Sequence, residues 1–140
     1  MNGRYFLDTN IFVYAFDSSF PVKARIADDL IRSALSAKTG AISYQVVQEF
    51  YSAGFRRFPG PLQGRQAEIY LSTVLIPLCA VQSSPTLFAR ALHLFARYHL
   101  QWYDALIISG ATEAKCGILY SEDFQHGQKF DGVEICNPFL

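Results

Sequence analysis

The sequence has few cysteines and no long apolar run, and these absences exclude whole classes of protein. There are three cysteines, an odd number, and they lie in hydrophobic contexts without the paired spacing of a metal site. We therefore expect reduced thiols and a cytoplasmic protein rather than a secreted disulfide scaffold. No apolar run approaches the roughly 20 residues of a membrane-spanning helix. Only three apolar residues separate Arg4 from Asp8, which argues against a signal peptide.

Net charge is also absent, because twelve basic side chains balance twelve acidic ones. A neutral chain lacks the electrostatic footprint of many nucleic-acid binders, and tight nonspecific binding of duplex is not expected. Basic side chains gather only locally, at Arg56, Arg57 and Arg65, where a solvated helix end explains them at least as well as a phosphate contact. Neither a GxGxxG nor a GxxxxGK[ST] phosphate loop occurs, and no serine lies in a nucleophile elbow.

What the chain does contain is an alternation of short apolar runs and helical patterns. Its 140 residues and 51% hydrophobic content predict one globular domain, residues 1–140, with a sizeable core. Apolar runs predict strands at 5–7, 41–43, 78–81, 118–120 and 133–136. Apolar residues at helical spacing predict helices at 21–38, 44–55, 65–74, 86–98 and 103–117. Gly40 is expected to end the first, Pro77 to close the third and Gly117 to end the last. This order predicts a mostly parallel sheet covered on both faces.

Four acidic residues fall at informative places in this layout. Asp8 follows the first strand, Glu49 lies in the largely apolar helix after the second, Asp104 opens a helix and Asp123 follows a later strand. Ligands of open α/β sheets bind at the carboxyl ends of the strands, where these side chains could converge. Carboxylates about 4 Å apart repel by roughly 4 kcal/mol at an effective dielectric near 20, unless a cation joins them. Mg²⁺ or Mn²⁺ suits such oxygen ligands and would support hydrolysis of a phosphodiester.

Each of these acids also has a structural explanation. Asp8 and Asp104 could cap the helices that follow them, since Asp is a preferred N-cap residue. Glu49 could belong to a solvent-facing helix stripe, and Asp123 could be a turn residue. Core packing or capping is favoured over ligand binding for His93, His99, Trp102 and Tyr103, although the two aromatic side chains also suit base stacking. His126 follows the fourth acid and could approach substrate, but a loop histidine in a Gly-bearing turn is commonly inert.

Four segments together carry a resemblance to a known family. They are FLDTNIFVYAFD, SYQVVQEF with Glu49, WYDALIISGA with Asp104, and LYSEDFQHGQ with Asp123. In this order they resemble the PIN-domain family, and most closely its VapC-type ribonuclease toxins of toxin–antitoxin pairs. The resemblance implies an α/β three-layer α/β/α sandwich and a Mg²⁺- or Mn²⁺-dependent nuclease that cleaves single-stranded RNA.

The resemblance also implies roles for individual residues. Asp8, Glu49 and Asp104 match the three acids of the family's metal site, and Asp123 matches its more variable fourth. Glu122 is the alternative at that position, but Asp123 stands two residues after a serine, as in the family pattern. The accompanying polar residues, which would orient carboxylates or water, are Asn10, Ser121 and Thr9.

Partners follow from the same resemblance, which implies an antitoxin protein and a homodimer. The sequence also offers more aromatic surface than one small domain needs, which favours an interface between two copies of the chain. The aromatic residues concerned are Tyr51, Phe55, Phe58 and Tyr70. Two other functions remain open. Asp8-Thr9-Asn10 after a strand resembles the nucleophile segment of haloacid-dehalogenase phosphotransferases, although that segment wants an acid at position 10. A PIN domain that binds RNA or protein without cutting is the other.

Overall fold

A sheet of short strands runs through the computed structural model, which describes residues 3–140. The strands are β1 (Tyr5–Leu7), β2 (Gly40–Ser43), β3 (Cys79–Val81), β4 (Ile118–Tyr120), β5 (Lys129–Phe130) and β6 (Val133–Cys136). The helices are α1 (Thr9–Ala15), α2 (Pro21–Ala37), α3 (Tyr44–Arg57), α4 (Gly64–Tyr70), α5 (Ile76–Leu78), α6 (Pro85–Tyr98) and α7 (Trp102–Glu113), with a π-helical turn, η1 (Leu71–Leu75), between α4 and α5.

The strand order β3-β2-β1-β4-β6-β5 makes β1 the point from which the sheet grows in both directions. β1 pairs in parallel with β2 on one side and with β4 on the other. β2 pairs in parallel with β3, and β4 with β6, whereas β5 is antiparallel to β6. A crevice forms outside the carboxyl ends of the strands where the order reverses. In this chain that place lies just after Leu7 and Tyr120, at Asp8 and Ser121.

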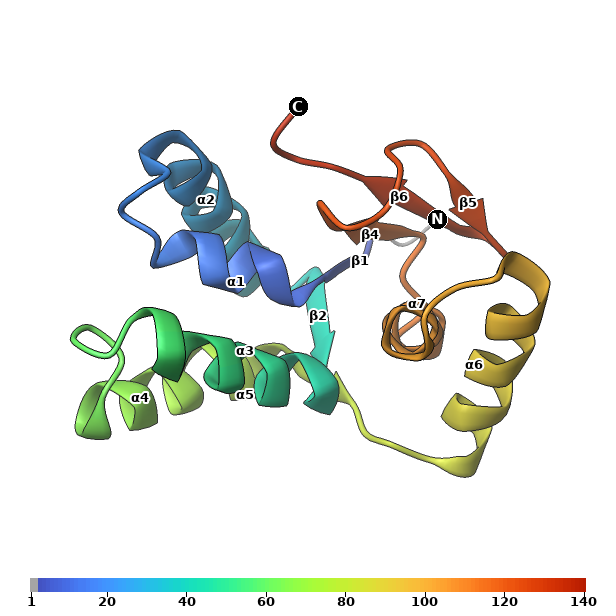
Figure 1. Cartoon of the computed structure of the whole chain (residues 1–140), viewed down its shortest axis with the longest axis horizontal. Coiled ribbons are helices and arrows are strands. Elements are labelled where there is room, and N and C mark those ends of the chain that lie inside the picture. Colours follow the sequence, from blue (N-terminus) through green and yellow to red (C-terminus); the bar gives the residue numbers. More distant parts are fainter. Residues whose placement is uncertain (1–2) are drawn as a thin grey trace.

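Two helical layers enclose the sheet. Helix α7 packs against β2, β4 and β6, and α6 packs on α7; Figure 1 shows α7 end-on between the sheet and α6. Helices α1, α2 and α3 lie on the other side, where α1 contacts both α2 and α3 and α2 contacts β2. Fully buried side chains fill the space between the layers, including Phe6, Leu7, Ile42, Ile108 and Leu119. The predicted fold class, an α/β/α sandwich with a mostly parallel sheet, is confirmed.

Several predicted boundaries were wrong for local reasons. Pro77 does not close the helix after Arg65, because the helical path continues through η1 and α5 to Leu78. Pro77 lies in the first turn of α5, where a missing N–H costs little. Helix α7 ends at Glu113, and Lys115 rather than Gly117 adopts the left-handed conformation, with φ 60°. β5 was not predicted, since only Phe130 of its two residues is buried.

Gly40 serves packing rather than helix termination. Lys38 is the left-handed cap of α2, with φ 57°. A Cβ at Gly40 would stand 2.3 Å from the Cβ of Ala34, far inside van der Waals contact. Glycine therefore lets α2 approach the start of β2.

The predicted aromatic surface is mostly internal. Phe58 is buried and Tyr70 half-buried, and both pack on Phe16, with ring centroids 6.2 and 5.0 Å away. Tyr51 is half-buried and donates its hydroxyl to the Ala67 carbonyl at 2.7 Å. Only Phe55 of this set is exposed. None of the helices in residues 3–140 has the length and apolar character that crossing a membrane requires.

Candidate metal and active site

The first part of the site is the turn from β1 into α1. Asp8 is buried, with 3% of its surface exposed, and is the N-cap of α1. Its Oδ1 accepts a hydrogen bond from the backbone N–H of Thr9 at 2.7 Å. The backbone N–H of Asp8 donates to the Tyr120 carbonyl at 3.0 Å, which extends the contact between β1 and β4. Asp8 therefore caps the helix and also faces the crevice between these strands.

Ser121 joins the end of β4 to this turn. Its Oγ donates to Asp8 Oδ2 at 2.7 Å and accepts the backbone N–H of Asp123 at 3.0 Å. The Asn10 amide Nδ2 lies 3.5 Å from the same Oγ, at the outer limit of a hydrogen bond. Ser121 is fully buried, so these contacts are shielded from water. One hydroxyl thus fixes both Asp8 and the backbone that carries Asp123.

Glu49 reaches the same place from α3. Its Oε1 accepts the Thr9 hydroxyl at 2.6 Å, and its Oε2 accepts the Gln45 amide at 3.1 Å. The Gln45 amide also donates to the Tyr103 carbonyl at 3.0 Å, in the first turn of α7. Glu49 is half-buried and held by residues of α1 and α3, so it is not part of a free solvent-facing stripe. Nothing in the sequence pattern singled out Gln45, whose role depends on the tertiary contact with Tyr103.

Asp104 lies in the first turn of α7, but it is not the cap. The N-cap is Gln101, which makes no side-chain capping bond. Burial raises the pKa of Asp104, and the charges of Asp123 and then Glu49 raise it further. The capping explanation for Asp104 is therefore wrong, and its carboxylate lies within electrostatic range of two other acids.

The pKa of Asp8 is raised by burial and by the charges of two of the other acids. Burial is the largest cause and raises its pKa from 3.8 to about 7. The hydrogen bonds from Ser121 and Thr9 lower the pKa, whereas the charges of Asp123 and Glu49 raise it. Asp8, Glu49, Asp104 and Asp123, which are far apart in the sequence, therefore share one electrostatic environment.

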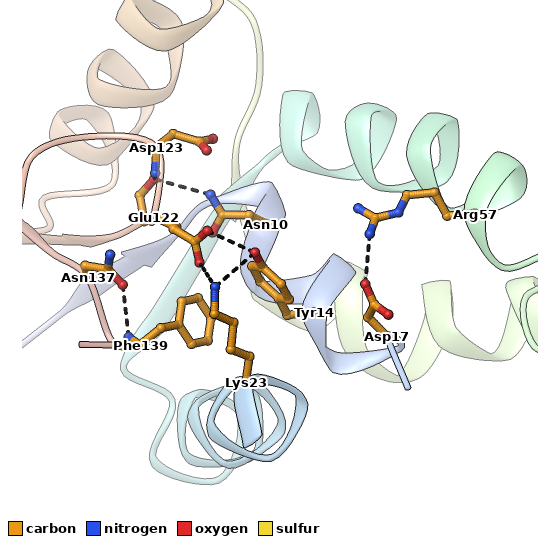
Figure 2. A network of polar contacts seen from close by, with 10 residues as sticks. Asn10, Tyr14, Asp17, Lys23, Arg57, Glu122, Asp123, Asn137 and Phe139 are labelled. Atoms are coloured by element: carbon orange, nitrogen blue, oxygen red, sulfur yellow. Dashed lines mark hydrogen bonds and ion pairs between the residues drawn. The ribbon is translucent and has the colours of Figure 1, made fainter. Parts of the chain in front are cut away.

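Glu122 and Asp123 are adjacent in the chain, but their side chains interact with different groups. Figure 2 shows Glu122 turned toward Lys23 and Tyr14, with Asp123 on the other side of the loop. The Lys23 ammonium lies 2.9 Å from Glu122 Oε2, and the Tyr14 hydroxyl donates to Glu122 Oε1 at 2.9 Å. Lys23 also lies 4.7 Å from the centroid of the Tyr14 ring. Glu122 is thus neutralised locally, while the charge of Asp123 acts on Asp8 and Asp104.

A groove between α1 and α3 opens beside these residues. It encloses about 500 Å³, and its walls include Thr9, Asn10, Glu49, Asp123 and Arg56. Arg57 also lines it, and Figure 2 shows this side chain paired with Asp17, whose Oδ2 lies 2.8 Å from the guanidinium. The groove therefore has an acidic part near the strand ends and a basic part at the C-terminus of α3.

The residues present suit a hard divalent cation. Within residues 3–140, no three His, Cys, Asp or Glu side chains converge closely enough to hold a metal ion by themselves. Mg²⁺, however, keeps several waters and commonly uses only one or two carboxylates. The side chains here offer oxygen atoms, and neighbouring negative charges raise the pKa of Asp8. The buried Asn10 Oδ1 has no hydrogen-bond partner among the described residues. An oxygen-seeking cation would offset each of these costs.

The three histidines make contacts with residues other than the four acids of the site. His93 on α6 lies 3.8 Å from Asp131, and His126 Nδ1 accepts the backbone N–H of Asn137 at 3.0 Å. His99 is the left-handed cap of α6. Trp102 packs on α6, with its ring centroid 6.5 Å from that of Phe88. The contacts of His99 and Trp102 agree with the capping and packing roles expected from the sequence, whereas His93 is exposed.

Proteins with this fold are known. Residues 5–129 match the PIN domain family. The structure is similar to a toxin–antitoxin complex from Klebsiella pneumoniae, with a TM-score of 0.66 and 21% identity over 96% of this chain and 97% of that one. It is similar to VapBC2 from Rickettsia felis bound to a DNA fragment from their promoter, with a TM-score of 0.64 and 19% identity over 94% and 96% of the two chains. VapC20 from Mycobacterium tuberculosis, a sarcin–ricin loop cleaving toxin, gives a TM-score of 0.58 and 20% identity over 85% and 89%. No curated protein sequence matches the chain.

Proposed function

The chain belongs to the PIN-domain family, and we propose on that premise that it is a metal-dependent endoribonuclease that cleaves single-stranded RNA. The observation that carries the proposal is the mutual electrostatic effect of four acids from distant segments near the β1/β4 crevice. The charges of Asp123 and Glu49 raise the pKa of Asp8, and the same two charges raise the pKa of Asp104. Four acids from distant segments in one environment are costly unless a cation is bound there.

We assign the metal site to Asp8, Glu49, Asp104 and Asp123, with Mg²⁺ or Mn²⁺ as the ion. The ion, when bound, would activate water and neutralise the charge that develops on a phosphodiester. The protein's own part is to fix the carboxylates before substrate arrives. Ser121 and the Thr9 backbone hold the two oxygens of Asp8, and the Thr9 hydroxyl and Gln45 hold those of Glu49. Such preorganisation reduces the reorganisation needed during reaction.

Hydrolysis of a simple phosphodiester tests this assignment without knowledge of the RNA target. Bis(p-nitrophenyl) phosphate with Mn²⁺ should be hydrolysed by the wild-type protein, and Asp104→Asn should lower the rate by more than about a hundredfold. Glu113→Gln is the matched control, since Glu113 lies at the far end of the same helix and pairs with Arg90. A wild-type protein that shows no Mn²⁺-dependent hydrolysis, or an Asp104→Asn protein as active as the control, would refute the nuclease proposal.

We propose further that the protein is the cytoplasmic toxin of a toxin–antitoxin pair, with an antitoxin protein as partner. The similar Klebsiella structure is a toxin–antitoxin complex, and VapC20 is a toxin that cleaves the sarcin–ricin loop. Expression of the wild-type chain should then arrest growth of a bacterial host, whereas Asp104→Asn should not. Normal growth with abundant folded wild-type protein would contradict the toxin role.

A homodimer is part of the same proposal, although its aromatic argument is weaker than the sequence suggested. Phe55 is exposed, and so are Ile69 and Ile76 nearby in the chain. Sedimentation at high concentration should show a species of twice the chain mass. A monomer throughout would exclude the homodimer while leaving the nuclease proposal intact.

The two alternatives have less support. Asp8 would be the nucleophile of a phosphotransferase, but both of its oxygens accept hydrogen bonds and the side chain is buried. A phosphorylated Asp8 after incubation with a phosphate ester would nonetheless favour that reading. RNA binding without any metal-dependent cleavage would favour the non-catalytic PIN domain.

A further inference from the structure

A second pocket lies on the other side of the acidic site, between α3, β3, α6 and α7. Its volume is about 240 Å³, which suits a small flat group rather than a helix or a folded chain. Its walls combine four aromatic residues, Tyr44, Phe88, Trp102 and Tyr103, with hydroxyl and side-chain amide groups that include Ser43, Gln48 and Gln82. Aromatic faces together with amide groups are the chemistry that recognises an unpaired nucleobase.

The pocket touches the acidic site through Gln45. Gln45 and Tyr103 line the pocket, and the Gln45 amide donates both to Glu49 Oε2 at 3.1 Å and to the Tyr103 carbonyl at 3.0 Å. Tyr103 directly precedes Asp104. A nucleotide whose phosphate lies at the acids therefore has this pocket as an immediate neighbour.

Polar groups in the pocket have unused bonding capacity. Ser43 is 4% exposed, and its Oγ has no hydrogen-bond partner in the part of the chain that the structure describes. It is the N-cap residue of α3, yet its side chain makes no capping bond. An unsatisfied buried hydroxyl is costly, and rotation of the Ser43 side chain toward a ligand in the pocket would let it form the missing bond.

The aromatic residues are open to a ligand despite their contacts with one another. Tyr103 is 63% exposed and Phe88 is 42% exposed, although each lines a concave surface. The rings of Phe88 and Trp102 are nearly parallel, at 26°, with centroids 6.5 Å apart. Core packing alone would not leave two large aromatic side chains exposed around one cavity.

We propose that this pocket binds one nucleobase of the RNA beside the cleaved phosphodiester, and so contributes to substrate selection. The proposal rests on the proposed ribonuclease function for its biological meaning. Binding of the base itself is a separate property, which can be measured without catalysis. Stacking on the aromatic rings supplies affinity, and Gln48, Gln82 and Ser43 supply discrimination among bases.

Trp102 is the only tryptophan of the chain and reports directly on the pocket. The four nucleoside 5′-monophosphates would be titrated into the full-length protein in EDTA while tryptophan fluorescence is recorded. We expect saturable quenching with unequal dissociation constants for the four bases. Ribose 5-phosphate, which has the phosphate but no base, should not quench. Quenching by ribose 5-phosphate equal to that by the nucleotides, or no saturable quenching by any nucleotide at millimolar concentration, would overturn the proposal.

Helix α6 offers a matched pair of variants. Phe88 and Phe95 are similarly exposed, at 42% and 44%, and both contact Trp102, but only Phe88 lines the pocket. Phe88→Ala should weaken the preferred nucleotide about tenfold, as expected for loss of a base–aromatic stack, and Phe95→Ala should not. Equal dissociation constants for the two variants would also overturn the proposal.

Two further measurements keep the result independent of folding and of the nuclease assignment. Gln48→Ala changes an exposed side chain and should alter the ranking of the four bases while the melting temperature stays constant. Phe95→Ala changes a side chain of α6 outside the pocket and should hydrolyse bis(p-nitrophenyl) phosphate at the wild-type rate. Absent hydrolysis by the wild-type protein would refute the proposed function alone, whereas the nucleotide titration decides the base pocket.

Discussion

The Ser121 hydroxyl donates a hydrogen bond to Asp8 Oδ2 at 2.7 Å and joins residues that are 113 positions apart in the chain. The bond is buried and spans the two strand ends where the sheet order reverses. It lowers the pKa of Asp8 against the larger opposing effect of burial. The contact therefore holds the carboxylate in place and favours its charged form.

We expect Ser121→Ala to destabilise the metal-free protein more at pH 8 than at pH 5. At the higher pH Asp8 is mostly ionised, and a hydrogen bond to a charged group contributes about 1.5–3 kcal/mol. At the lower pH the carboxyl is protonated and the loss is smaller. Ser109→Ala is the control, because the buried Ser109 hydroxyl donates to the neutral Leu87 carbonyl at 2.8 Å. Urea unfolding at both pH values measures the difference, and equal losses for Ser121→Ala would contradict it.

The stability of the metal-free wild-type protein should fall as the pH rises from about 4 to about 7. Burial and neighbouring charges raise the pKa of Asp8 to about 7, so in this window the folded state holds a proton that the unfolded state has released. Stability is then highest at the acidic end and levels off above pH 7. This rise in the pKa of Asp8 corresponds to a loss of folding stability on the order of a few kcal/mol.

Denaturant unfolding in EDTA at closely spaced pH values measures this slope. Asp8→Asn should flatten it, because the amide does not titrate. Saturating Mn²⁺ should raise the stability of the wild-type protein at pH 8, since an ion that binds only the folded state contributes RT ln(1 + [L]/Kd). A profile that rises between pH 5 and 7 in EDTA would show that Asp8 does not dominate the pH response.

The sequence predicted the strands of the parallel sheet well because each is a short apolar run between polar or turn-forming residues. Tyr5–Leu7 and Ile118–Tyr120 match their predicted bounds. It also placed Asp8 and Asp123 after strands, Asp104 in the first turn of a helix and Glu49 inside a helix. Contacts that depend on two distant segments were not predictable in this way. Gln45 is half-buried, and its contact with the Tyr103 carbonyl depends on the packing of α7 beside α3, which the sequence pattern does not reveal.

The predictions of helix ends and of exposed aromatic residues were wrong where tertiary packing, rather than the local sequence, determines the structure. Gly40 and Gly117 suggested helix ends, yet Lys38 and Lys115 take the left-handed positions. Phe58 and Tyr70 looked like surface aromatics because apolar spacing does not tell which face of a helix the rest of the chain covers. These differences move element ends and one surface, but none of the four acids.

Thr9→Val should weaken metal binding more than stability. The Thr9 hydroxyl donates to Glu49 Oε1 at 2.6 Å, while the backbone contact of Thr9 with Asp8 does not depend on the side chain. Loss of a residue that orients a metal-binding carboxylate typically costs about 10–100-fold in metal affinity. Mn²⁺ titration by calorimetry measures it. Thr112→Val is the control, since its hydroxyl only contacts the Ile108 carbonyl one turn earlier; equal Mn²⁺ affinities in the two variants would remove Thr9 from the site.

Glu122 and Asp123 provide the final prediction, because one adjacent pair of acids should give opposite results. Asp123→Asn removes a charge that raises the pKa of Asp8 and of Asp104, so it should weaken Mn²⁺ binding. In the metal-free protein, the fall in stability with rising pH should also level off at a lower pH than in the wild type. Glu122→Gln removes a partner of Lys23 and Tyr14 instead.

The side chains of Lys23 and Glu122 are each about one-third exposed, so solvent screens the pair, and Glu122→Gln should cost little stability and leave Mn²⁺ affinity nearly unchanged. Calorimetric titration of Mn²⁺ into both variants, with urea unfolding in parallel, separates the two effects. Stronger loss of Mn²⁺ binding in Glu122→Gln than in Asp123→Asn would reverse the assignment. Such a result would require the Lys23 contact to break when the ion binds, and the variant Lys23→Met should then bind Mn²⁺ more tightly than the wild type.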